Sequence, residues 1–345
     1  MPQYYYTPPG FNNYGKSYAD DERARAQREL LLRQRRERSE LRRFGIFLGL
    51  ATISYLLIQV LLAAGLQAVG LYDLFTSNTI FQYAVTIVGV SFCAVALPFL
   101  IVALINRKRY CYPIVPNKKI SPSRCIAWVL FGLGCCSASN IAVNYVIQLV
   151  KTVFNRQLTQ GDTAKPSNIV ECLFELIAIA VIPAICEELA MRCCSLQLLR
   201  KYGASFAIVT VSVVFGLLHG NVIQFLFAFL VGLVLAYVTV KTQSIVPAIF
   251  IHMLNNGLSV IQDLLRLLAS QKASEYFVTV IFIVFIVGAI ASAVYLFFKK
   301  EFSSRLDKGN TVLSTGEKIK AFFFPGMIVP FVALILLTLT TIKKM

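Results

Sequence analysis

Ionisable side chains stand inside otherwise apolar stretches of this chain. The sequence has two histidines, and both lie in such runs: His219 in VVFGLLHGN and His252 in IFIHMLNNG. A third run, ending in AICEELAMR, carries Glu187 and Glu188. Charged and imidazole groups are costly in an apolar environment and are functional candidates by default. Their chemistry here is proton transfer, metal binding or both, because carboxylates and imidazoles are general bases and metal ligands.

The spacing of the carboxylates separates a supporting role from a reactive one. Glu188 and Arg192 are four residues apart, so a helix places them on one face as an ion pair. Glu187 points about 100° away from Glu188 around the helix and is left to face a cavity. In a dry site such a carboxylate can act as a general base near neutral pH. We interpret Glu171 and Glu175, about three to four turns earlier, as a solvated or paired helix end.

The two histidines each have a partner one helical turn away. Phe215 precedes His219 by four residues, so its ring can shield the imidazole from lipid. His252 and Asn256 share a helix face in the same way, and together they offer two donors to one oxygen. Donors aimed at a developing oxyanion are often the largest single contribution in acyl transfer. The chemistry that these groups favour is hydrolysis by a water activated between Glu187 and His219.

A turn at Tyr202-Gly203 brings two of these groups to the same depth. Glu187 lies 15 residues before Tyr202, and His219 lies 16 residues after Gly203. With a rise of about 1.5 Å per residue, an antiparallel hairpin places both at one level. His252 reaches that level only if the segment 191–203 protrudes beyond the bilayer.

A divalent metal is the alternative to a metal-free glutamate mechanism. Two histidines and a glutamate form a known catalytic zinc set, so Glu187, His219 and His252 are candidate ligands for zinc or another divalent ion. The spacing is not HExxH, which excludes the standard zincin arrangement. The sequence leaves both mechanisms open, and no cofactor is certain.

Three motifs in order resemble those of a known family. EExxxR at 187–192, FxxxH at 215–219 and HxxxN at 252–256 are similar to the signatures of the CAAX-protease and bacteriocin-processing (CPBP, or Abi) intramembrane proteases. The resemblance is to the bacterial branch and covers about residues 165–262. It implies a polytopic intramembrane endopeptidase of the kind usually labelled a metalloprotease.

The resemblance also implies roles for the individual residues. Glu187 takes the water-activating position, and Glu188 with Arg192 the supporting positions. His219 matches the histidine of the second motif, preceded by Phe215. His252 and Asn256 match the third motif and would stabilise the oxyanion.

The composition excludes several classes of protein. Hydrophobic residues make up 57% of the 345 residues and charged residues 14%, against roughly 45–50% and 25% in soluble domains. The net charge of +16 does not indicate nucleic-acid binding, because the basic residues lie in short stretches between apolar runs. The nine cysteines stand mostly inside those runs and do not indicate a disulfide framework. We expect an all-α, multi-pass protein of the cell membrane.

About nine transmembrane helices are expected, since one span needs about 20 apolar residues. The catalytic core would be formed by the fourth to the seventh. The expected spans are 44–70, 80–105, 125–150, 167–190, 204–219, 222–240, 245–265, 276–298 and 321–341.

The distribution of basic residues predicts a cytoplasmic N-terminus. With that orientation 26 of the 33 lysines and arginines fall in segments on the inner side. The basic stretch 21–43 is expected to form a charged helix against anionic headgroups. The inner segments are 1–43, 106–124, 191–203, 241–244 and 299–320.

These patterns divide the chain into four parts and leave three functions to compare. Residues 1–43 would be a cytoplasmic disordered and basic arm, 44–165 accessory transmembrane helices, 166–262 the protease core and 263–345 further transmembrane helices. The leading hypothesis is an endopeptidase acting on a membrane-associated peptide or protein, with the lipid bilayer as its other partner. A proton- or ion-coupled transporter and a non-catalytic immunity or scaffold protein are the alternatives.

Overall fold

The structure is a computed structural model, and it describes residues 18–159, 165–301 and 306–344. Most of them are helical, so the predicted all-α class is confirmed. The remainder are loops and a pair of three-residue antiparallel strands, in which Arg156 pairs with Lys344. Residues 1–17, where we expected disorder, lie outside the described residues.

The helices include π-helical segments (η1, η3, η4 and η6) and 3-10 turns (η2 and η5). In chain order the elements are α1 (Tyr18–Ala68), α2 (Tyr72–Ser77), α3 (Thr79–Val85), η1 (Thr86–Ala96), α4 (Leu97–Ile105), η2 (Arg107–Arg109), α5 (Pro122–Phe154), β1 (Arg156–Leu158), α6 (Ile169–Glu175), η3 (Leu176–Val181), α7 (Ile182–Glu188), η4 (Leu189–Ser195), α8 (Leu196–Leu199), η5 (Arg200–Tyr202), α9 (Ala204–Leu218), α10 (Val222–Thr242), α11 (Val246–Leu268), α12 (Gln271–Phe298), α13 (Thr315–Phe322), η6 (Phe323–Met327), α14 (Ile328–Leu339) and β2 (Ile342–Lys344).

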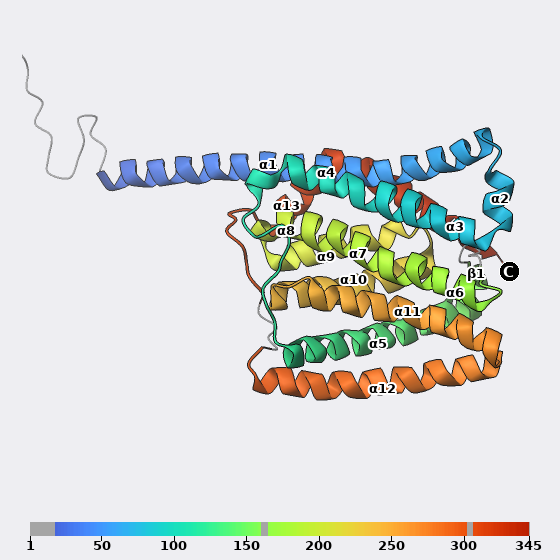
Figure 1. Cartoon of the computed structure of the whole chain (residues 1–345). Coiled ribbons are helices and arrows are strands. Elements are labelled where there is room, and N and C mark those ends of the chain that lie inside the picture. Colours follow the sequence, from blue (N-terminus) through green and yellow to red (C-terminus); the bar gives the residue numbers. More distant parts are fainter. Residues whose placement is uncertain (1–17, 160–164, 302–305, 345) are drawn as a thin grey trace, which may run out of the picture.

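These helices form one bundle with their axes roughly aligned. In Figure 1, α1 runs along one side with α4 and α13, α5 and α12 run along the other, and α7, α9, α10 and α11 lie between them. Each of the nine predicted spans falls mostly on helical residues, the ninth across a kink at Phe324, and the number of spans stays a prediction. Among the described residues, six stretches are long and apolar enough to cross a membrane, and α9 and α14 are shorter apolar helices. The bundle therefore has the character of a membrane protein, as predicted.

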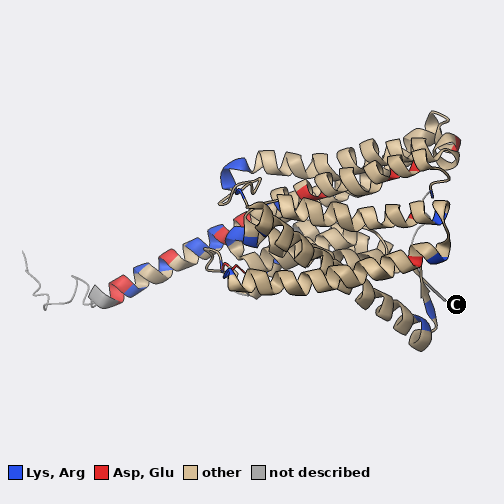
Figure 2. Cartoon of the chain, turned by 60° about the horizontal axis from the view of Figure 1, so that its bottom comes forward, with Lys and Arg blue, Asp and Glu red and all other residues tan. Residues whose placement is uncertain are grey.

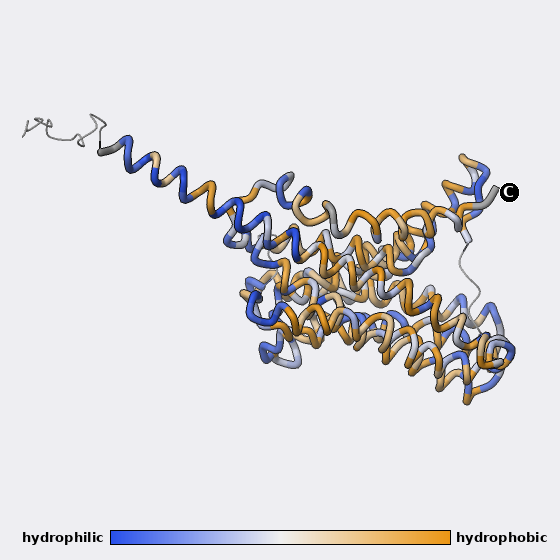
Figure 3. Tube along the Cα trace, turned by 90° about the horizontal axis from the view of Figure 1, so that it is seen from above, coloured by the Kyte–Doolittle hydropathy of each residue, from blue (hydrophilic) through white to orange (hydrophobic). Residues whose placement is uncertain are grey.

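The basic arm and the first predicted span form one continuous helix. α1 extends over 51 residues, so there is no break at residue 43, where we expected a boundary between parts of the chain. Figure 3 shows its hydrophilic first half projecting from the bundle and its apolar second half packed along it. The helix continues because neither Pro nor a turn signal stands between the charged and the apolar stretch.

The polar segments that the charge pattern placed on one side lie at one end of the bundle. The Arg33 side chain donates a hydrogen bond to the Asn310 side chain (2.6 Å), and the Asn310 backbone N–H donates to the Lys201 carbonyl (3.0 Å). The Lys118 backbone N–H donates to the Gln243 carbonyl (3.0 Å). Figure 2 shows lysines and arginines gathered at this end, with the C-terminus at the other.

Small residues let the C-terminal helices approach α1 closely. Gly45 and Gly49 are four residues apart on α1, and a Cβ at Gly45 would lie 2.0 Å from the carbonyl oxygen of Phe322. A Cβ at Gly49 would lie 2.3 Å from the carbonyl oxygen of Gly326. Pairs of glycines with this spacing are typical of close helix packing in membranes. The contact holds the C-terminal helices against the N-terminal one.

Candidate active site

The site is centred on the helical segment that contains both glutamates. Glu187 and Glu188 end α7, between the π-helical segments η3 and η4. A π-helical turn is rare and is often found at functional sites, because it displaces side chains and frees backbone carbonyls. Two backbone carbonyls of η4 accept hydrogen bonds from side chains. Ser195 Oγ donates to Ala190 O (2.9 Å), and Gln197 Nε2 donates to Arg192 O (3.0 Å).

The turn that follows α9 fixes the first histidine. His219 is the last residue before Gly220, whose positive φ of 67° suits a residue without Cβ. The Asn221 side chain then accepts a hydrogen bond from the Gln224 backbone N–H (2.8 Å) and caps α10. His219 Nδ1 lies 2.9 Å from the Phe215 carbonyl oxygen. A carbonyl only accepts, so Nδ1 carries the proton and Nε2 is left for other partners.

Glu188 lies between the arginine and the second histidine. Its Oε2 is 3.1 Å from Arg192 Nε, and its Oε1 is 2.9 Å from His252 Nδ1. The side chains of Glu188 and Arg192 are 0% and 1% exposed. The i,i+4 ion pair expected from the sequence is thus formed and fully buried. Its carboxylate also orients an imidazole from α11, as second-shell carboxylates commonly do.

Phe215 contacts three members of this group. Its ring meets His219 edge-on, with centroids 5.1 Å apart, and His252 with centroids 6.0 Å apart. The Arg192 guanidinium carbon lies 4.7 Å from the centroid of the same ring. The aromatic therefore does more than shield His219. It packs the two imidazoles and the buried cation against one another.

We predict that Phe215→Leu lowers kcat about tenfold, because the ring's edge and face contacts to the imidazoles and the guanidinium are lost while most apolar volume remains. The unfolding free energy should fall by about 1 kcal/mol. Kinetics and thermal unfolding of the purified variant measure both effects. The matched control is Phe206→Leu on the same helix, which removes an edge-on contact to Phe322 (6.1 Å) away from the site. Equal loss of kcat in both variants would contradict a positioning role for Phe215.

Glu187 and His219 line one cavity, which we call the Glu187 cavity. Its volume is about 170 Å³, and its wall includes Tyr55, Phe215 and Gln224. The hairpin argument that placed Glu187 and His219 at one level is thus supported by the structure. The Glu187 side chain is 22% exposed, in contrast to the fully buried Glu188. The two neighbouring carboxylates are therefore divided as predicted, one buried in an ion pair and one facing a cavity.

His252 connects the buried pair to the Glu187 cavity. Its Nδ1 is bonded to Glu188, and its Nε2 lies 3.8 Å from Glu187 Oε2. The second histidine therefore does reach the level of the glutamates. Since Nδ1 is occupied, Nε2 is the ring nitrogen that remains for reacting atoms.

The role of Asn256 as a second donor beside His252 stays a prediction, and one of its two N–H groups is already engaged elsewhere. Its side-chain N–H donates to the Ile179 carbonyl (3.1 Å), and its Oδ1 accepts from Asn255 (3.2 Å). Ile179 lies in the π-helical segment η3, where a carbonyl loses its α-helical partner. Asn256 satisfies that carbonyl and also lines a second, larger cavity.

The proposed ligand set is not gathered around one point. Within the described residues, no group of three or more His, Cys, Asp or Glu side chains is arranged to hold a metal ion. Each histidine keeps its Nε2 free, because Nδ1 is bonded to a carbonyl in His219 and to Glu188 in His252. Glu187, His219 and His252 are neighbours without forming a coordination sphere, so we derive no step through a metal.

Tyr55 is a site residue that no pattern in the sequence indicated. It lies in the first apolar run, on α1, and its hydroxyl donates to the Leu218 carbonyl (2.7 Å) next to His219. It lines the Glu187 cavity. Of the solvated or paired helix end that we expected, the structure supports pairing: Glu175 is 6% exposed, and Glu171 accepts hydrogen bonds from Ser167 and Asn168.

Comparison with known proteins agrees with the motifs. Residues 169–258 match the family model described as type II CAAX prenyl endopeptidase Rce1-like. The matched segment runs from the start of α6 into α11 and contains every motif residue of the site. No match was found among curated proteins or among solved structures. The segment that carries the two glutamates and the two histidines is thus similar to the CAAX-protease family, as its three motifs predicted.

Proposed function

We propose that this protein is an intramembrane endopeptidase that hydrolyses peptide bonds of a membrane-associated peptide or protein. The observation that carries the proposal is the position of Glu187, a partly exposed carboxylate in a cavity shared with His219 and 3.8 Å from His252 Nε2. The family of the matched segment supports the same class of activity.

In the proposed mechanism Glu187 takes a proton from a water held in its cavity. The hydroxide oxygen attacks the carbonyl carbon, and negative charge develops on the carbonyl oxygen. His252 is assigned to that oxygen in its doubly protonated form, whose Nδ1–H donates to Glu188 and whose Nε2–H donates to the oxyanion. When the C–N bond breaks, the proton on Glu187 passes to the leaving amine. Glu188 and Arg192 hold His252 in place without contacting the substrate.

The proposed setting is the cell membrane, with the N-terminus in the cytoplasm. The basic residues at one end of the bundle support this orientation, since positive charge is retained on the cytoplasmic side. The hydrophilic half of α1 would then be placed near anionic headgroups at that surface. The family description names prenylated CAAX proteins as substrates, and a prenylated CAAX peptide is therefore the first probe to use.

The proposal is tested with the purified protein in liposomes. A farnesylated CAAX peptide, its unprenylated form and a transmembrane peptide are incubated with the wild type, and products are identified by mass spectrometry. We expect cleavage of at least one probe at a defined bond, and no cleavage by Glu187→Gln. Intact probes with folded wild-type protein, or the same products from Glu187→Gln, would overturn the proposal.

We predict that catalysis does not depend on a bound metal. The wild type should keep its activity after dialysis against a chelator, since the proposed mechanism assigns water activation to Glu187 and the oxyanion to His252 without a metal. His252→Ala should lower kcat by about 10²–10³-fold, the usual effect of removing an oxyanion donor. Metal content is measured by plasma mass spectrometry in the wild type and in variants of both histidines. Stoichiometric zinc in the wild type, lost with activity in His219→Ala and His252→Ala, would reverse this prediction.

A further inference from the structure

A second cavity is lined in part by α11, and the mechanism above does not use it. It has a volume of about 650 Å³ and is lined by residues of α5, α10, α11 and α12. This is within the range of about 300–1,000 Å³ that is usual for ligand sites. We call it the amide cavity, because side-chain amides form two of its walls.

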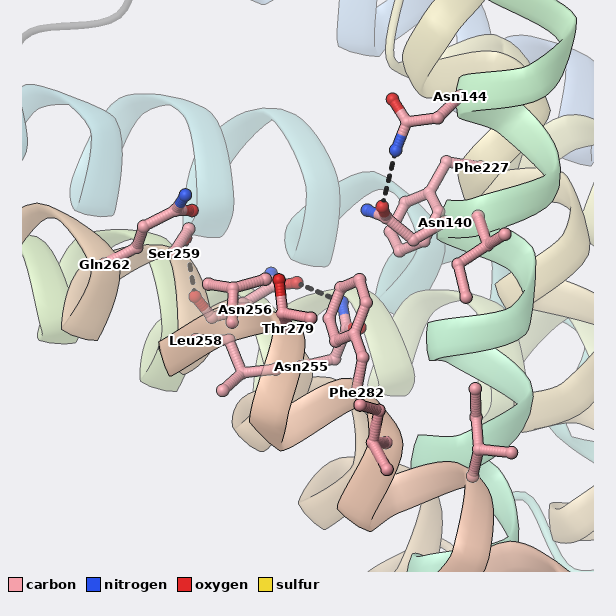
Figure 4. A pocket seen from close by; sticks show the side chains of 14 residues that line it. Asn140, Asn144, Phe227, Asn255, Asn256, Leu258, Ser259, Gln262, Thr279 and Phe282 are labelled. Atoms are coloured by element: carbon pink, nitrogen blue, oxygen red, sulfur yellow. Dashed lines mark hydrogen bonds between the residues drawn. The ribbon is translucent and has the colours of Figure 1, made fainter. Parts of the chain in front are cut away.

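The amides face one another from two helices. Asn140 and Asn144 stand one turn apart on α5 and are bonded to each other (2.9 Å). Asn255, Asn256 and Gln262 stand on α11, on the opposite wall (Figure 4). Ser259 and Thr279 add hydroxyl groups, and Phe227, Phe282 and Ile286 are among the apolar side chains between the amides. Five amides in one cavity at membrane depth are costly unless they have hydrogen-bonding partners.

The hydrogen bonds among these amides leave part of their capacity unused. Each amide side chain offers two N–H donors and a carbonyl acceptor. Asn144 donates to Asn140, and Asn255 donates to Asn256, so in each pair one carbonyl is engaged by its neighbour. Within the described residues, the amide of Gln262 makes no hydrogen bond. The cavity therefore offers both donors and acceptors to an occupant.

The lining selects the chemistry of that occupant. None of the side chains that form the cavity wall is charged, so neither a phosphate headgroup nor a metal cation finds a counter-charge there. A purely hydrocarbon chain would leave the amides unsatisfied. An extended peptide presents alternating backbone N–H and C=O groups, which pair with amides, and its apolar side chains fit between Phe227 and Phe282. Backbone groups must be paired inside a membrane, and this cavity supplies partners for them.

We propose that the amide cavity binds an extended, uncharged segment of the substrate peptide, next to the bond that is cleaved. Asn256 lines the cavity one helical turn from His252, so the bound segment leads toward the reacting atoms. This inference rests on the proposed function for its orientation relative to cleavage. On this proposal the amide cavity binds peptide backbone, and not a lipid or an ion, at a site outside the catalytic residues.

Crosslinking tests occupancy without requiring cleavage. In a Glu187→Gln background, Ile283 is replaced by benzoylphenylalanine, and the protein in liposomes is irradiated with a 12-residue farnesylated CAAX peptide of neutral apolar sequence. Ile283 lines the cavity and is 58% exposed. Its neighbour Val284, 52% exposed and outside the cavity wall, is the matched control position. We expect a peptide adduct from position 283 and none from position 284. Equal adducts, or none, would overturn the proposal.

Substitution of Gln262 tests how much a cavity amide contributes to peptide binding. Gln262→Leu, which touches no residue of the catalytic group, should raise KM for the same peptide about tenfold and leave kcat unchanged. Gln148→Leu, exposed on α5 outside the cavity, should change neither. An unchanged KM in Gln262→Leu with normal cleavage would mean that the cavity holds only water. If no peptide is cleaved by the wild type while the crosslink at 283 forms, the proposed function fails and the peptide site stands.

Discussion

Glu187→Gln is expected to lower kcat/KM more than about 10²-fold, the usual scale for loss of a general base. Glutamine has nearly the same shape as glutamate, but its amide cannot take a proton from water. The side chain is partly exposed in its cavity and does not share the buried ion pair, so the fold should tolerate the change. Initial rates with the cleaved probe and the thermal unfolding midpoint, measured on the same preparation, check both parts.

Glu171→Gln is the control for this variant. Glu171 stands on the same membrane helix, but its carboxylate binds Ser167 and Asn168 at the helix start, far along the chain from the cavity. Its substitution should leave kcat/KM within about twofold, since surface changes are usually small. Wild-type activity in purified Glu187→Gln would remove Glu187 from the catalytic role. Equal loss in both variants would indicate a structural effect of the charge.

The helices, and those site contacts that lie within one helix or across one short turn, could be predicted from local sequence patterns. Apolar runs set the helices, because a membrane leaves the backbone no alternative to internal hydrogen bonds. The i,i+4 spacing was enough to pair Glu188 with Arg192, and residue counts around Tyr202-Gly203 were enough to bring Glu187 level with His219. These are contacts within one helix or across one short turn, where spacing determines geometry.

Contacts between helices that are distant in the sequence could not be predicted from residue spacing. Asn256 shares a face with His252, but its side chain donates a hydrogen bond to the Ile179 carbonyl. That carbonyl lies in a π-helical segment, which no residue pattern predicted. Tyr55 reaches the site through a hydrogen bond from α1 to the Leu218 carbonyl, a contact between residues 163 positions apart in the sequence. A charged helix followed by an apolar span was expected around residue 43, but composition alone did not show that the two form one continuous helix.

Arg192→Met is expected to lower the unfolding free energy by about 3–5 kcal/mol, the cost of leaving a buried charge without its partner. Glu188 is 0% exposed and would keep only its contact to His252. Methionine fills much of the volume of the arginine stem, so the loss reports on charge more than on packing. Activity should fall as well, because His252 is held by the same carboxylate. Thermal and denaturant unfolding in detergent micelles measure the change.

The double variant Glu188→Gln with Arg192→Met separates charge from catalytic geometry. Removing both charges of a buried pair is often neutral or stabilising, so the double variant should recover most of the stability that Arg192→Met loses. Its activity should stay low, because glutamine accepts the His252 Nδ1 hydrogen bond without the negative charge that supports it. Recovery of both stability and activity would mean that the carboxylate serves only to compensate Arg192. A single variant as stable as the wild type would show that the ion pair does not hold the site together, and the positioning of His252 would then rest on Phe215.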